Sequence, residues 1–132
     1  MPLLVLVSMM FCHIIDDYKL QGWLATGKQR SWWKSNAPEK LYKYDYIMAL
    51  VEHAFSWTFM IHVPIFIYSY MTSSWSSFVV YIVLFIFNWA VHAITDHAKA
   101  NLLLINLVID QTIHIIQILL TWAVYMYGGE LV

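Results

Sequence analysis

Long apolar runs alternate with short polar segments along most of the chain. A helix needs about 20 mainly apolar residues to cross a bilayer. Four runs meet this need when a few polar interruptions are accepted: about 2–20, 46–70, 78–98 and 107–127. The first run has neither a basic start nor a small-residue cleavage site, so we expect a helix of the mature protein rather than a signal peptide.

This pattern predicts an all-α, polytopic membrane protein. Residues 1–132 would form a single transmembrane domain, a four-transmembrane-helix bundle with one longer loop at 21–45. Composition agrees, because 61% of the residues are hydrophobic and only 11% are charged, against about a quarter in an average soluble domain. Membrane lipids are therefore expected partners. The net charge of −1 and the lack of a long basic run argue against a nucleic-acid partner.

Charge along the chain predicts how the bundle is oriented. Six of the seven Lys and Arg residues lie at or within the 21–45 loop, and the seventh, Lys99, ends the third run. Basic residues concentrate on the cytoplasmic side of membrane proteins. The connection at 71–77 is uncharged and the carboxy-terminal end carries only Glu130. We therefore expect a basic cytoplasmic loop and both termini on the non-cytoplasmic side.

The loop also carries the run RSWWK, from Arg30 to Lys34. Trp residues favour the headgroup region of a bilayer, so the run is typical of an interfacial anchor. Its basic residues would equally suit a docking surface for an anionic lipid headgroup. The sequence leaves both interpretations open.

Ionisable residues interrupt all four apolar runs at helical spacing. A charged group inside a bilayer costs about 2.5 to 3.5 kcal/mol, so such groups usually point inward and carry function. In the first, third and fourth runs, steps of three and four residues place them on one helix face. These polar stripes are His13, Asp17 and Gln21; Asn88, His92, Asp96 and Lys99; and Asn106, Asp110, His114, Gln117 and Thr121.

Chain direction places these stripes at one depth. The first and third runs head inward and contain His-x-x-x-Asp, whereas the fourth heads outward and contains Asp-x-x-x-His. His53 in the second run reaches the same level, while His62 and His97 are out of phase with the site. We therefore expect one shared site formed by seven residues: His13, Asp17, His53, His92, Asp96, Asp110 and His114.

Imidazole and carboxylate groups in this arrangement point to a divalent metal. Zinc suits these ligands, with manganese or iron as alternatives, and two ligands at i and i+4 can hold one ion. Seven side chains would serve two ions bridged by an aspartate, or one ion with other carboxylates orienting its ligands. The competing interpretations are a proton or ion relay and interhelical hydrogen bonding, which contributes only about 0.6 kcal/mol per bond in membranes.

Four segments together resemble a known family. They are HIIDDYKLQGWLATGK (His13 to Lys28), EHAFSW (Glu52 to Trp57), HAITDHAKA (His92 to Ala100) and DQTIH (Asp110 to His114). In this order they resemble the small membrane proteins called domain of unknown function 3307, found in bacteria and their phages. Tyr18 departs from the resemblance, since an apolar aromatic residue is usual there.

The resemblance implies a multi-pass protein of the bacterial inner membrane, encoded by a bacterium or a phage. It supports the seven metal-site residues and adds Gln21, Lys99 and Gln111 around them, to orient ligands or bind substrate. The family has no assigned reaction, so the resemblance implies a fold and a site but no activity. More loosely, the His/Asp pattern is similar to that of membrane-bound metal-dependent hydrolases.

Three classes of function follow from these observations. The first is a membrane-embedded metal-dependent hydrolase acting on a lipid or lipid-linked phosphoester or amide. In it Asp17, Asp16 or Glu52 would accept a proton, and Lys99 with the basic loop would hold a phosphate. The second is a proton or divalent-metal transporter or channel that uses the same residues. The third is a phage membrane effector without catalysis, and a homo-oligomer is compatible with all three.

Overall fold

A computed structural model describes residues 1–72 and 78–128 of the chain. Within these residues every regular element is a helix. Two segments lie outside the described residues: 73–77 and the end of the chain at 129–132. The first of them makes up most of the uncharged connection that the sequence predicts on the outer side. The elements are α1 (Pro2–Ile15), a π-helical turn (Asp16–Leu20), α2 (Leu24–Gly27), α3 (Arg30–Asn36), a 3-10 turn (Lys40–Tyr42), α4 (Asp45–Thr72), α5 (Phe78–Ala100) and α6 (Leu107–Tyr127).

Three of these helices, α4, α5 and α6, are long and apolar enough to cross a membrane. They coincide with the apolar runs predicted at 46–70, 78–98 and 107–127. The first run is also helical, but its α-helical part has 14 residues, fewer than the roughly 20 that a bilayer requires. The structure thus supports a helical membrane protein with three candidate spans, and the fourth span stays a prediction.

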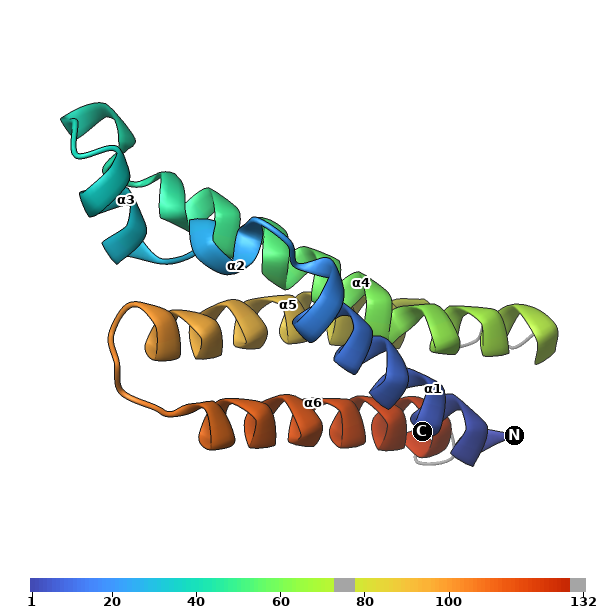
Figure 1. The fold of residues 1–132 in the computed structure, drawn as a ribbon. Helices are drawn as coiled ribbons and strands as arrows, with labels where there is room; N and C mark the ends of the chain where they lie inside the picture. Colours follow the sequence, from blue (N-terminus) through green and yellow to red (C-terminus); the bar gives the residue numbers. More distant parts are fainter. Residues whose placement is uncertain (73–77, 129–132) are drawn as a thin grey trace.

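The long helices and α1 pack around a shared interior. Helix α1 contacts α4 and α6, α4 contacts α5, and α5 contacts α6. The start of α1 and the end of α6 lie at the same end of this bundle (Figure 1). An apolar core fills that end, and its buried members are Val5, Met9, Trp57, Ile61, Ile65 and Ile118. Outward-facing Leu, Ile and Val side chains stay exposed, as a lipid-facing surface requires.

The 21–45 segment folds back onto the bundle instead of forming an open loop. Gly22 adopts a φ of +50°, a left-handed conformation that suits glycine because it has no Cβ. The chain then turns into α2, which packs against α4, and continues into α3 beyond the end of α5 (Figure 1). This fold brings the end of α2 over the polar half of the bundle.

Candidate metal centre

His and Asp side chains from the helices converge in the half of the bundle opposite the apolar core. Three overlapping groups have ligand atoms within 4.8 Å of one another, and all members are buried. The structure therefore brings six of the seven residues proposed from sequence spacing to one place. The groups are Asp17 with His53 and His92, His92 with Asp96 and His114, and Asp17 with Asp110 and His114.

His114 belongs to two of the three ligand groups, one with His92 and Asp96 and the other with Asp17 and Asp110. Its Nε2 atom is 3.6 Å from Oδ1 of Asp96 and 3.5 Å from Oδ1 of Asp110. All three atoms are buried and have no hydrogen-bond partner among the described residues. Two ligands of a tetrahedral zinc ion stand roughly 3.3 Å apart, given metal-ligand distances near 2.0 Å. The donor set and its unpartnered atoms thus fit a divalent cation.

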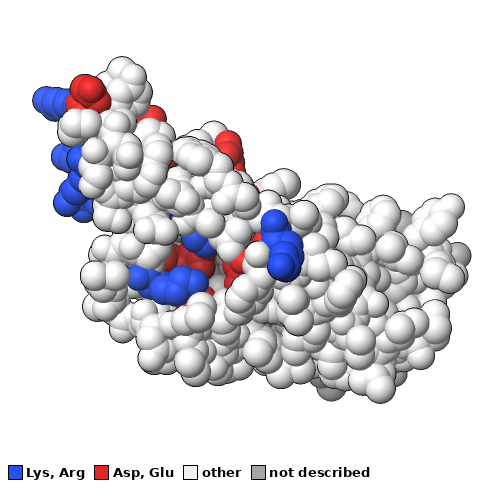
Figure 2. All heavy atoms as spheres, in the orientation of Figure 1, with Lys and Arg blue, Asp and Glu red and all other residues white. Residues whose placement is uncertain are grey.

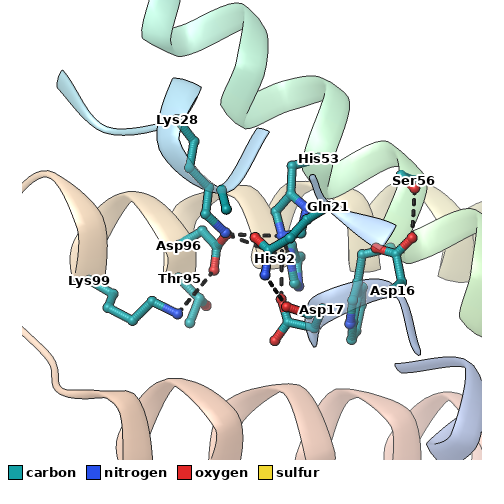
Figure 3. A network of polar contacts seen from close by, with 12 residues as sticks. Asp16, Asp17, Gln21, Lys28, His53, Ser56, His92, Thr95, Asp96 and Lys99 are labelled. Carbon is teal, nitrogen blue, oxygen red and sulfur yellow. Dashed lines mark hydrogen bonds and ion pairs between the residues drawn. The ribbon is translucent and has the colours of Figure 1, made fainter. Parts of the chain in front are cut away.

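A second position surrounds His53. Its Nε2 atom is 3.4 Å from Oδ1 of Asp17, 3.3 Å from Oδ2 of Asp96 and 3.3 Å from Nε2 of His92. Asp96 therefore serves both positions, with Oδ1 toward His114 and Oδ2 toward His53. Figure 3 shows Asp17, His53, His92 and Asp96 turned toward one another from three different helical elements.

Hydrogen bonds behind His114 orient its ring for metal binding. The ring Nδ1 atom is 3.3 Å from Oε1 of Gln117. The Gln117 amide group donates to the side-chain oxygen of Asn88 over 3.1 Å, and the Asn88 amide donates to Thr121 over 2.7 Å. Because Gln117 uses its N–H groups on Asn88, its oxygen accepts from Nδ1–H of His114. The lone pair of Nε2 is then free for a metal, the arrangement found around many ligand histidines.

Replacing Gln117 with leucine should weaken metal binding by roughly 10-fold to 100-fold, because partners that orient ligand histidines contribute about that much. Isothermal titration of detergent-purified protein with Zn²⁺ measures the change. Thr112→Val is the matched control, since Thr112 is exposed on the same helix and bonds only to the backbone. Equal affinities for the Gln117→Leu variant and the wild type would contradict this role for Gln117.

His13, a ligand in the sequence-based prediction, lies outside the three groups. The indole N–H of Trp57 donates to its Nδ1 atom over 2.8 Å. An indole nitrogen can only donate, so a neutral His13 carries its proton on Nε2 and has no free lone pair for a metal. Its ring centroid is 6.0 Å from that of His114. His13 therefore borders the candidate centre as a possible donor, without joining the ligand groups.

Two lysines bring positive charge to the cluster. Lys99 places Nζ 2.5 Å from Oδ2 of Asp110 and 3.9 Å from Oδ1 of Asp96, and its side chain is 24% exposed. Lys28 contacts Oδ2 of Asp96 from the end of α2 and is 5% exposed. Figure 2 shows basic and acidic atoms together in a hollow between the α2 segment and the α5–α6 hairpin. The hollow connects the cluster with the surface.

Sequence reasoning missed the role of Lys28. Its charge fitted the basic loop, so nothing distinguished it from the exposed lysines that set membrane orientation. The one available signal was its position at the end of the longest family-like segment. Gln111, in contrast, was expected near the site, and its amide donates to Oδ2 of Asp17 over 2.6 Å and to Oδ2 of Asp110 over 3.1 Å.

The other carboxylate and amide candidates have different positions. Asp16 accepts a hydrogen bond from Ser56 over 2.7 Å, and Figure 3 shows it turned toward Ser56 and away from the cluster. Glu52 is exposed and lines a groove with Trp23, so the structure does not bring it to the site. The Gln21 amide bonds to the backbone carbonyl of Asp17, one turn back in its own helix.

The two histidines expected outside the site do lie apart from the ligand groups. His62 makes a 2.8 Å hydrogen bond from Nδ1 to the backbone carbonyl of Thr58. His97 stacks on Tyr46 with ring centroids 6.1 Å apart. Neither belongs to the three His/Asp groups of the described residues.

Trp57 separates the candidate centre from the apolar core. It is fully buried and stacks on His92, with ring centroids 4.2 Å apart and an angle of 19° between the planes. Its other face belongs to the apolar cluster with Met9 and Ile61. Trp57 thereby positions His92 and excludes water from the inner side of the site. It lies within the EHAFSW segment, but the spacing of ionisable residues could not identify it.

Comparisons with protein-family models, curated proteins and solved structures find no match to this chain. The resemblance to domain of unknown function 3307 therefore stays a prediction. The assignments below rest on the chain's own residues and geometry.

Proposed function

We propose that this protein is a membrane-embedded metal-dependent hydrolase that cleaves a lipid or lipid-linked phosphoester or amide. The observation that carries this proposal is that Nε2 of His114 lies beside one oxygen of Asp96 and one of Asp110, and that these three buried atoms make no hydrogen bond within the described residues. Structural hydrogen bonding poorly explains them, because an unpaired buried polar group costs about 1 to 3 kcal/mol. A cation bound between His114 and these carboxylates would reduce this cost.

The proposal includes a fourth span and a cytoplasmic orientation. Helix α1 and the π-helical turn together cover 2–20, which is close to the length that a bilayer requires. Asp110 lies in the first turn of α6, and Lys99 lies in the last turn of α5. The basic 21–45 segment packs at the same end, which the positive-inside rule assigns to the cytoplasm. A site at this depth is within reach of lipid headgroups of the inner membrane.

The nitrogen and oxygen ligands favour zinc, with manganese and iron as alternatives. When bound, such an ion lowers the pKa of a coordinated water toward about 7 and polarises the bond that breaks. Asp17 is the proton acceptor: it belongs to two ligand groups, and Gln111 holds its Oδ2 in place. Lys99 reaches the cluster from its open side and would bind a negatively charged substrate oxygen.

Replacing Asp17 with asparagine should lower the hydrolysis rate by roughly 10²-fold to 10⁴-fold, the usual contribution of a general base. Mass spectrometry of total bacterial lipids after incubation with zinc-loaded protein would measure the loss of substrate and the gain of product. Asp45→Asn is the matched control, because Asp45 lies at the start of α4 in the groove with Glu52.

Replacing Asp16 with asparagine tests which of these two neighbouring aspartates accepts the proton. Asp16 is bonded to Ser56, so Asp16→Asn should change the rate only a few-fold. A loss at Asp16 as large as that at Asp17 would contradict the assignment of the base. Absence of any lipid product from metal-loaded, folded wild type would contradict the hydrolase itself.

A transporter of protons or divalent metal is the second candidate. The hydrogen-bonded chain from His114 through Gln117 and Asn88 to Thr121 favours it, because it extends polar groups from the cluster toward the apolar half of the bundle. Flux of Zn²⁺ or protons into liposomes that contain the purified protein distinguishes the two functions. Flux that is lost in an Asn88→Leu variant, without lipid hydrolysis, would support transport.

A further inference from the structure

The two oxygens of Asp96 have opposite surroundings. Oδ1 faces His114 and has no hydrogen-bond partner. Oδ2 contacts the Lys28 ammonium group and lies 3.3 Å from Nε2 of His53. Each candidate metal position therefore has an ammonium group beside it, that of Lys99 on the Asp110 side and that of Lys28 on the His53 side.

The Lys28 backbone is fixed in place by the segments on both sides of it. The side-chain amide of Asn101, at the end of α5, donates to the carbonyl of Lys28 over 3.0 Å. The Asn101 oxygen accepts from the backbone N–H of Arg30 over 2.6 Å, and Trp33 donates to the carbonyl of Gly27 over 2.7 Å. A Cβ at Gly27 would lie 2.7 Å from the Trp23 ring, so a side chain there would require this ring to shift.

Lys28 and Lys99 differ in how firmly they are held. Lys99 comes from the open side of the cluster, and its side chain is 24% exposed, so it can turn outward when a ligand binds. The Lys28 side chain is 7% exposed. If its ammonium group moved away from Asp96, it would be a buried charge without a partner, which is strongly unfavourable. Lys28 is therefore a permanent part of the cluster.

Charge balance in the cluster also favours a single ion. Three carboxylates and two ammonium groups lie in this cluster, those of Asp17, Asp96 and Asp110 and those of Lys28 and Lys99. With neutral histidines they carry one net negative charge. One divalent ion makes the cluster singly positive, while a second would leave three uncompensated positive charges inside the bilayer, at a large cost.

We propose that the centre binds one metal ion, at His114 and the carboxylates beside it, and that the Lys28 ammonium group occupies the place of a second ion. This inference rests on the metal centre of the proposed function and specifies its stoichiometry. It gives Lys28 the charge-stabilising part that a second ion has in two-metal hydrolases. The position around Asp17 and His53 becomes available for a metal only when the Lys28 side chain is replaced by an uncharged one.

The test compares metal content in wild type, Lys28→Met and Lys28→Arg after saturation with Mn²⁺ and removal of free ion. Elemental mass spectrometry counts the ions, and electron paramagnetic resonance reports whether two Mn²⁺ ions are coupled. We expect about one uncoupled ion in wild type and in Lys28→Arg, and about two coupled ions in Lys28→Met. Lys34→Met is the matched control, because Lys34 is exposed in α3.

The outcomes separate this inference from the proposed function. Two coupled ions in wild type, or one ion in folded Lys28→Met, would overturn the role of Lys28 and leave the metal centre intact. No ion in folded wild type would overturn the metal centre, and with it this inference. If Lys28→Met does not fold, the wild-type count and spectrum alone decide between one ion and two.

Discussion

Replacing His114 with alanine is expected to abolish metal binding, from about one equivalent to less than a tenth. His114 supplies the nitrogen shared by two of the three ligand groups, and its neighbours Asp96 and Asp110 cannot close a zinc site alone. Elemental mass spectrometry after dialysis against a mild chelator measures the bound metal. Asp110→Ala should behave in the same way, because its unpartnered oxygen faces the same nitrogen.

His62→Ala is a closely matched control for His114→Ala. Both histidines are buried in the membrane-spanning part of the chain, but His62 bonds to Thr58 and belongs to none of the ligand groups. The His62→Ala variant should therefore retain its bound metal. Folding of each variant is checked by circular dichroism and size-exclusion chromatography. Retention of metal in folded His114→Ala would place the ion elsewhere.

Replacing Asp96 with leucine should lower the free energy of unfolding by about 3 to 5 kcal/mol. The reason is that Lys28 then keeps a buried charge with no partner, and breaking one side of a buried ion pair typically costs this much. Unfolding by denaturant in detergent, with chelator present to remove metal effects, measures the change. The double variant Asp96→Leu/Lys28→Met should recover most of the loss, because both charges are gone.

This recovery distinguishes a lost charge pair from simple damage to packing. Damage to packing would make the double variant as unstable as Asp96→Leu, or less stable. Asp45→Leu is the control for removing a carboxylate outside the cluster, and it should change the free energy of unfolding by about 1 kcal/mol at most, the usual contribution of a carboxylate in the first turn of a helix. Equal stability of Asp96→Leu and wild type would contradict the buried contact between Lys28 and Asp96.

Much of the architecture follows from the sequence because a bilayer limits the alternatives. Backbone groups in hydrocarbon must be paired within the segment, so long apolar runs form helices. This reasoning places α4, α5 and α6 within a few residues of their observed ends. This reasoning does not decide whether the first run crosses the membrane, because its α-helix ends at Ile15 and a π-helical turn begins at Asp16.

The same regularity explains how far the site could be predicted. Residues four apart share a helix face, and reversal of chain direction reverses their order, so spacing alone indicated that His92 with Asp96 and Asp110 with His114 would meet. Spacing placed Asp17 on the polar face but left Asp16 open as a proton acceptor, because neighbours on a helix are about 100° apart and a modest rotation of the helix could exchange them. Packing against α4 decided this, because it gave Asp16 a partner in Ser56.

The sequence by itself determined which long helices form and which polar faces they carry, because both depend on local periodicity and on the solvent. Only the tertiary structure decided what each polar atom meets. It turned Lys28 from a basic loop residue into the partner of Asp96, through the fold of α2 and the contacts of Asn101. It also separated His13 from the ligands, because Trp57 occupies its Nδ1 atom. Such contacts join segments far apart in the chain, so no local pattern records them.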